Sequence, residues 1–345
     1  MKIKPVIYSL LVALFIAGSQ DALAIKKKVA TSGMTYLGIS MGARESAMGD
    51  AATAITKGIN GLWHNPSAIA DIERFAFTFN QITWLVDTKL YGTAFAYSLG
   101  DWGTIGIDLT YMDYGEIIGT RPVPKSVDIR EFVITGDIAV EDYAIGLSYA
   151  RRISDRFAIG FKVKRLHESL GTARFVYRDP GEVRPVPDEF YKEQEWKLND
   201  WGLDLGTVYK IGWKDLTFAM TMQNFSRDMK YWYEEFQTPM CLRMGMAMDV
   251  SEFFMPDNEN LAANLSIDAL HPNDYTERIH LGTELVCMQQ FALRGGYKFN
   301  HDVETYTLGL GLNFDVAGVS AILDYAFTSA EYFKDIHRFS FQFAF

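Results

Sequence analysis

The residues whose spacing comes nearest to a catalytic motif are Gly38-Ile39-Ser40-Met41-Gly42, which match the pattern G-x-S-x-G. In hydrolases this pattern holds a nucleophilic serine on a sharp turn between a buried strand and a helix. Later elements of an α/β sheet then supply the histidine and the acid. No alternating strand–helix pattern follows Ser40, so we interpret the match as coincidental and predict no catalytic residues. A lipid-hydrolysing protein is conceivable, but nothing else in the sequence demands an enzyme.

Metal, cofactor and nucleic-acid chemistry are equally poorly supported. The histidines lack the spacing of metal ligands, and they are scattered at His64, His167, His271, His280, His301 and His337. There is no phosphate-binding loop and no dinucleotide fingerprint, so we expect no cofactor. Two cysteines, Cys241 and Cys287, are too few for a disulfide framework. A net charge of −10 argues against nucleic acid as a partner.

The last nine residues indicate how the chain is organised. Their aromatic side chains recur at every second position, at Phe339, Phe341, Phe343 and Phe345. An extended strand would place all four on one face, with Ser340, Gln342 and Ala344 on the other. An edge strand of a soluble sandwich is the alternative, although an exposed aromatic ribbon invites aggregation. Bacterial outer-membrane barrels typically close on a strand ending in phenylalanine, so we interpret these residues as the closing strand and as a signal to the barrel-assembly machinery.

The same period-two alternation runs from Arg74 to the end of the chain. It forms about fourteen segments of roughly ten residues, the length that a tilted strand needs to cross a bilayer. Whether 129–140 is a further strand or part of a loop is open. Long and short links between segments mostly alternate, as expected when short turns face the periplasm and long loops face the exterior. The pattern predicts an all-β protein, a transmembrane antiparallel β-barrel of about fourteen strands over residues 74–345 in the outer membrane, among its lipids.

Polar residues within these segments share the face opposite the large apolar side chains. We therefore predict that they point into the lumen, where they could simply pair with one another: Asp108, Lys162, Lys164, Asp204, Arg243, Asp268, Glu284, Arg294 and Asp324. A charge facing lipid would cost about 2–4 kcal/mol at the middle of the membrane. Outward aromatic girdles at the membrane surfaces are expected at Trp84, Trp102, Trp201 and Trp213.

The N-terminal part of the chain has a different character. Lys2 and Lys4 precede an apolar run, and Ala22-Leu23-Ala24 supplies the small residues of a cleavage site, which predicts a signal peptide over residues 1–24. No other run approaches the length of a membrane-spanning helix. Residues 25–73 are rich in glycine, alanine and serine, and we expect this compact segment to fill a confined space.

Two motifs in this segment resemble the N-terminal signature of the PorV/PorQ family, within the wider FadL-like group of outer-membrane barrels. The first is Gly42-Ala43-Arg44-Glu45-Ser46-Ala47-Met48-Gly49-Asp50-Ala51, against the family pattern G-A-R-x-x-A-M-G-x-A. The second is Trp63-His64-Asn65-Pro66-Ser67, against W-N-P-A; this chain has histidine where the tryptophan is usual and serine in place of alanine. The resemblance implies a fourteen-stranded barrel whose segment 25–73 folds inward as a hatch or plug.

The resemblance also implies two functions. A PorV-like protein is a non-enzymatic component of type IX-like secretion or surface attachment, with secreted cargo proteins and a translocon as partners; this is the leading hypothesis. A FadL-like protein is a channel for hydrophobic small molecules such as fatty acids and aromatic hydrocarbons. A third hypothesis is a structural surface barrel whose long loops bind partners. Loop 169–199 contains acidic side chains that could bind divalent cations or basic partners, or could simply be solvated: Asp188, Glu189, Glu193 and Glu195.

Overall fold

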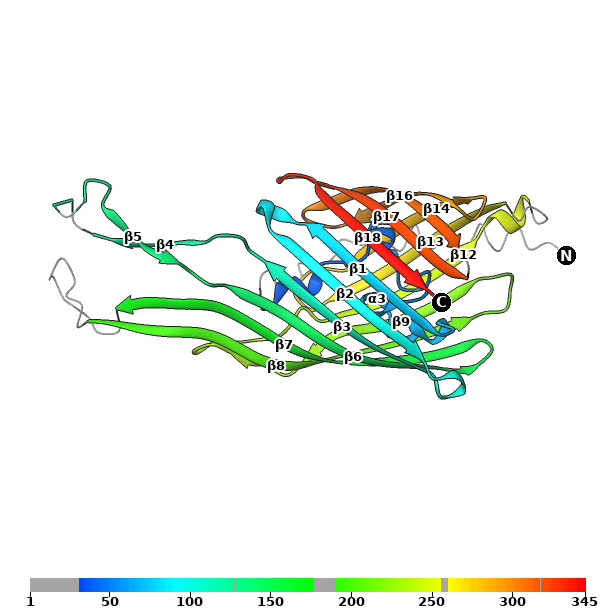
Figure 1. Ribbon diagram of the computed structural model, residues 1–345, viewed down its shortest axis with the longest axis horizontal. Helices are drawn as coiled ribbons and strands as arrows, with labels where there is room; N and C mark the ends of the chain where they lie inside the picture. The colour runs from blue at the N-terminus through cyan, green and yellow to red at the C-terminus, as the bar shows by residue number, and fades with distance from the viewer. Residues whose placement is uncertain (1–30, 124, 127, 177–189, 256–259, 317) are drawn as a thin grey trace, which may run out of the picture.

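A computed structural model describes residues 31–123, 125–126, 128–176, 190–255, 260–316 and 318–345 (Figure 1). The predicted signal peptide, Asp188 and Glu189 lie outside these residues. Within the described residues, no helix combines the length and the apolar composition needed to cross a membrane.

Fourteen antiparallel strands close into a barrel, which confirms the predicted fold class. Each pairs with its neighbour in chain order: β1 (Phe75–Thr83), β2 (Lys89–Ser98), β3 (Thr104–Asp113), β6 (Glu141–Ser154), β7 (Phe157–Val176), β8 (Tyr191–Lys210), β9 (Thr217–Ser226), β12 (Cys241–Asp249), β13 (Leu261–Pro272), β14 (Arg278–Cys287), β15 (Phe291–Phe299), β16 (Glu304–Val316), β17 (Val319–Ala330) and β18 (Ile336–Ala344). Residues 129–140 contribute no barrel strand. Instead they form one side of a separate hairpin, β4 (Ile118–Pro122) with β5 (Phe132–Asp137).

The terminal strand closes the cylinder. β18 pairs antiparallel with β1, so that Phe343 lies opposite Phe77 and His337 opposite Thr83 (Figure 1). Phe339, Phe341 and Phe345 are exposed on the outer face, whereas Ser340 and Gln342 are buried on the inner face. No free strand edge is left at this seam, which removes the hazard of an exposed aromatic strand. The role of these phenylalanines as an assembly signal stays a prediction.

Alternation along the strands gives the barrel an apolar exterior. In β16, Leu308 and Leu310 are 56% and 55% exposed, whereas the neighbouring Thr307 and Gly309 face the interior and are buried. Exposed leucine, isoleucine and phenylalanine side chains recur around the wall, as a lipid-facing surface requires. The protein is therefore an outer-membrane barrel.

The two ends of the barrel differ. At one end, β7 and β8 continue past the last β6 partner, Ser169, and form a projecting arm next to the β4–β5 hairpin (Figure 1). We call this the arm end; it also carries a small hairpin of β10 (Met229–Lys230) and β11 (Glu235–Phe236) and the turn η3 (Leu85–Asp87). The opposite end carries η4 (Gly100–Trp102), η6 (Ser251–Phe253) and the tight turns between β6 and β7, β14 and β15, and β16 and β17; we call it the turn end.

The predicted aromatic girdle is wrong at one position. Trp102, Trp201 and Trp213 are exposed on the outside, as expected. Trp84 instead packs against the interior cluster that contains Leu90 and Ile336. It follows the last residue of β1, where the chain turns over the barrel mouth and the period-two rule for side-chain direction no longer holds.

Candidate functional site

Residues 31–72 lie inside the barrel and are mostly buried; we call this segment the plug (Figure 1). It contains four short helices: η1 (Thr35–Gly38), α2 (Ala43–Ala47), α3 (Gly61–His64) and η2 (Pro66–Asp71). Its start is bonded to the arm end, where the Gly33 amide donates to the Gln237 carbonyl. Its other end reaches β1 at the turn end, so the plug runs the length of the lumen.

The first motif has one glycine on each side of helix α2, and the backbone conformation at both positions requires glycine. Gly42 precedes the helix with a φ of +85°, and Gly49 follows it with a φ of +64°, a region that disfavours other L-residues. Between them, Ala43 and Ala47 are fully buried, and Ala47 and Met48 pack directly against the wall. At Ala43 and Ala47, only a small side chain fits this approach of the helix to the sheet.

The second motif forms a capped turn. The Asn65 side-chain oxygen accepts hydrogen bonds from the Ser67 amide (3.1 Å) and hydroxyl (2.7 Å), while its amide donates to Thr53 and Thr207 carbonyls. Pro66 occupies the first position of η2, where a missing N–H costs nothing. His64 is buried with its Nε2 against the Met41 carbonyl, and Trp63 donates to the Thr110 hydroxyl at 3.0 Å. Ser40 contacts only the Ser46 hydroxyl, at 3.3 Å, among its described side-chain partners, and no histidine bonds to it.

The plug packs closely against inward-facing glycines of the barrel wall, which the sequence analysis did not single out. A Cβ added at Gly296 would lie 2.1 Å from the Gly49 nitrogen, and one at Gly160 would lie 2.4 Å from the Ser67 nitrogen. Close approaches of the same kind occur at Gly206, Gly282 and Gly309. The sequence does indicate that these glycines point inward, because they occupy the inward-facing positions of their strands. It does not indicate which plug residue each one contacts, because that residue is distant in the chain.

Charged residues tie the plug to β14, β15 and β17. Arg44 of the plug forms two 2.8 Å bonds to the Glu284 carboxylate. Arg294 bonds to the same carboxylate at 2.8 Å and to Asp324 at 2.6 Å. Four residues that the sequence analysis named separately therefore form one continuous buried chain of ion pairs.

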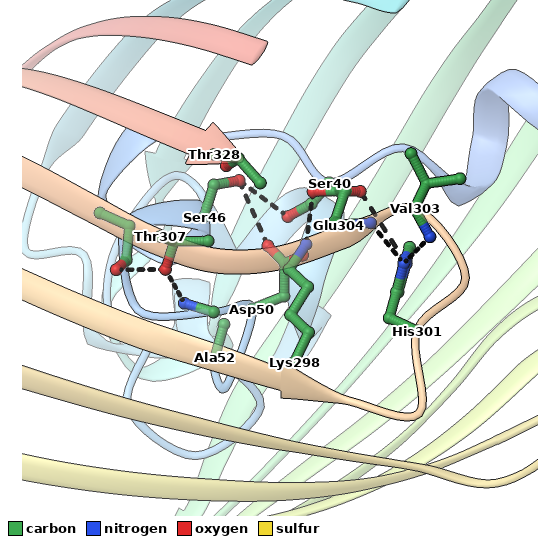
Figure 2. A network of polar contacts seen from close by, with 12 residues as sticks. Ser40, Ser46, Asp50, Ala52, Lys298, His301, Val303, Glu304, Thr307 and Thr328 are labelled. Carbon is green, nitrogen blue, oxygen red and sulfur yellow. Dashed lines mark hydrogen bonds and ion pairs between the residues drawn. The ribbon is translucent and has the colours of Figure 1, made fainter. Parts of the chain in front are cut away.

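A second network lies nearer the arm end (Figure 2). Lys298 bonds to Asp50 of the plug and, at 2.7 Å, to Glu304, which also accepts from Arg338 at 3.4 Å. Thr307 accepts from the Gly49 amide at 2.9 Å and donates to the Ala47 carbonyl at 2.8 Å. The sequence analysis missed Asp50, Lys298, Glu304 and Arg338, although Lys298 has the same strand parity as Arg294.

The other inward residues form pairs on the opposite wall or hold the plug directly. Lys162 lies 2.7 Å from Asp108, and Lys164 lies 2.8 Å from Asp204. One oxygen of Asp268 accepts from the Ala52 amide (3.0 Å), the Thr53 amide (2.9 Å) and the Thr53 hydroxyl (2.6 Å). Among the nine predicted lumen residues, Arg243 and Asp268 are the two that form no ion pair within the described chain.

A cavity of about 400 Å³ lies between the plug and the arm end of the barrel, and we call it the mouth cavity. Plug residues such as Leu37 and Ile39 form its floor. Its sides include Trp63, His64, Trp84, Arg243, Leu270, Tyr275, Arg278 and His301. A second cavity of about 500 Å³ opens at the turn end, between plug residues 57–59 and 71–72 and the strands β1, β17 and β18. The plug separates the two.

The conformation of the turn between β15 and β16, beside the mouth cavity, depends on a neutral His301 side chain. His301 Nδ1 accepts from the Val303 amide at 3.3 Å and the Glu304 amide at 2.9 Å (Figure 2). Burial, and next the positive charge of Lys298, lower the pKa of His301 to about 4. Because a protonated Nδ1 cannot accept a hydrogen bond, protonation would release both amides.

We expect this turn to lose stability in acid. The folded pKa lies below the unfolded value of about 6.5, so the contribution is complete above pH 6.5 and is lost as the pH falls through 4, at most about 3 kcal/mol. The measurement is the temperature at which the folded band disappears on a heat-modifiability gel, at pH 7 and pH 4. His301→Asn, which cannot protonate, should show a smaller difference than the native protein. Equal differences would contradict the assignment.

Comparisons with known proteins support the fold. No protein-family model matches the chain, and neither does any curated protein sequence. Among solved structures, the chain is similar to the toluene transporter TodX of Pseudomonas putida, with a TM-score of 0.56, 12% identity, and coverage of 88% of this chain and 97% of that one. It is also similar to the monoaromatic hydrocarbon channel CymD, with a TM-score of 0.53, 11% identity, and coverage of 89% and 98%. The similarity shows that this chain shares the fold of these two channels.

Proposed function

We propose that this protein is a non-enzymatic outer-membrane channel that admits hydrophobic small molecules, and that the plug controls their passage. The observation that carries the proposal is the mouth cavity, a space of about 400 Å³ whose lining combines tryptophan, tyrosine and aliphatic side chains with polar and charged ones. Ligand pockets of about 300–1,000 Å³ with mainly apolar linings and a few polar groups are typical of small-molecule sites.

The position of the cavity suits uptake. In barrels of this kind the long links face the exterior, so the arm end would be the outer one. A ligand entering there would meet the plug before reaching the turn-end cavity. Since ion pairs and backbone packing hold the plug to the wall, passage requires the plug to move or part of it to rearrange. In this proposal residues 25–73 act as the hatch.

The fold comparison favours this function over the secretion role. The similar structures are named as a hydrocarbon channel and a toluene transporter. The role in type IX-like secretion that the PorV/PorQ resemblance implies, with cargo proteins and a translocon as partners, receives no support from the comparisons. It makes a separate prediction, because loss of the gene would then change the secreted proteins and leave hydrocarbon uptake intact.

The test is uptake of labelled toluene by cells that produce the protein in their outer membrane. We expect faster uptake than in cells without it, and a several-fold reduction when Leu270→Trp narrows the mouth cavity. Leu270 is buried and lines this cavity. The matched control is Ile279→Trp on the neighbouring strand, where the side chain is 48% exposed on the outer face. Uptake that is the same with and without the protein would refute the proposal.

A further inference from the structure

Arg243 is a half-buried cation that forms no ion pair with another described residue. It projects inward from β12 and lines the mouth cavity, and its Nε and Nη1 atoms have no hydrogen-bond partner. Cys241, two residues away on the same strand face, offers only a thiol, which is a weak acceptor. By contrast, the guanidinium of Arg294 is 2% exposed and bonds to two carboxylates.

The carboxylates around Arg243 form no ion pair with it among the described residues. Asp268, on the adjacent strand, accepts three hydrogen bonds from the plug through one oxygen, and its other oxygen is buried without a hydrogen-bond partner. Asp274 accepts from the Ser32 hydroxyl, and Glu304 is held by Lys298 and Arg338. The buried Nε and Nη1 donors of Arg243 therefore lack acceptors, and an incoming anion would supply them.

Further hydrogen-bond donors, one of them a second arginine, lie near Arg243. Arg243, Leu270 and Arg278 stand side by side across β12, β13 and β14. Arg278 also lines the cavity, its Nε has no partner, and its closest carboxylate oxygen, on Asp302, is 3.9 Å away. His280, one inward position further along β14, is 3% exposed with both ring nitrogens unpartnered. An anion bound at Arg243 would therefore have further hydrogen-bond donors in the same row.

The remaining walls are suited to an aromatic ring. Leu270 lies between the two arginines, and Trp63, Trp84 and Tyr275 contribute aromatic surface to the same cavity. We propose that the mouth cavity binds a monoaromatic carboxylate, with its carboxylate on Arg243 and its ring against these side chains. The inference rests on the proposed channel function and deepens it, because a neutral hydrocarbon cannot satisfy the guanidinium whereas an aromatic acid can.

The experiment measures binding to the purified full-length protein in detergent by tryptophan fluorescence or calorimetry, with benzoate, toluene, decanoate and inorganic phosphate as probes. We expect benzoate to bind and Arg243→Met to weaken it about ten- to a hundredfold, the loss expected for a charged hydrogen bond of about 1.5–3 kcal/mol. Toluene binding should change little in Arg243→Met.

The matched control is Arg130→Met, because Arg130 is exposed beyond the barrel and pairs with Asp128. Arg243→Lys, which keeps the charge, should retain part of the affinity and serves if Arg243→Met does not fold.

The outcomes separate this inference from the proposed function. If toluene enters cells through the protein but benzoate does not bind, or binds equally to Arg243→Met, the inference fails and the channel function stands. If neither ligand binds nor passes, both fail. Phosphate competing as well as benzoate would show a general anion site, and decanoate binding more tightly than benzoate would show an aliphatic one; either result overturns the assignment to aromatic acids.

Discussion

Replacing Gly296 with alanine is expected to dislodge the plug and open the lumen to ions. The new Cβ would lie 2.1 Å from the Gly49 nitrogen and 2.3 Å from the Met48 carbonyl carbon. Both are backbone atoms next to helix α2, so no side-chain rotation can relieve the overlap. Either the plug or β15 must shift, and the plug is the less connected of the two, because its helices are a few residues long whereas β15 pairs along its length on both sides.

Conductance of single barrels in planar bilayers measures this effect. We expect the Gly296→Ala barrel to conduct at a higher level or to open more often than the native barrel. Gly295→Ala is the matched control, since residue 295 faces outward and the atom nearest to its added Cβ is 3.8 Å away. Identical conductance in the native, Gly296→Ala and Gly295→Ala barrels would show that this glycine contact does not hold the plug.

The second large effect is expected at Glu284. Glu284→Ala leaves Arg44 and Arg294 without their shared carboxylate, and both the Glu284 and Arg294 side chains are almost completely buried. Breaking a buried ion pair by removing one partner costs about 3–5 kcal/mol, because the other charge is then uncompensated. The temperature at which the folded band disappears on a heat-modifiability gel should therefore fall by several degrees.

An exposed ion pair provides the comparison. Glu195 lies 2.9 Å from Lys197 in the arm, and both side chains are about half exposed, so Glu195→Ala should change that temperature little. A double-mutant cycle of Glu284→Ala with Arg44→Met then isolates the contact between wall and plug. If Glu284→Ala behaves like Glu195→Ala, the buried network does not stabilise the barrel.

The mouth of the barrel illustrates where local pattern stops being informative. Within a strand, successive side chains point to opposite faces, so the parity of Asp108, Glu284 or Phe341 was enough to predict its side of the wall. At Trp84 the strand has ended, and the direction of its side chain depends on the turn η3 and on packing against the interior cluster that contains Leu90 and Ile336. The same limit applies to the plug, whose chain path follows from the wall that surrounds it.

By itself, the sequence determined the barrel: the strands, their inward and outward faces, their closure between β1 and β18, and the outer membrane as their environment. These follow from alternation between neighbouring residues, which is a local property of an extended backbone. Only the tertiary structure decided which charges meet, since Arg44 and Glu284 are 240 positions apart in the chain. It also decided which glycines contact the plug. In the mouth cavity, which has aromatic residues in its lining, it left Arg243 without an ion-pair partner among the described residues. No spacing in the sequence encodes those contacts, because they arise between strands and plug residues that come together only when the cylinder closes.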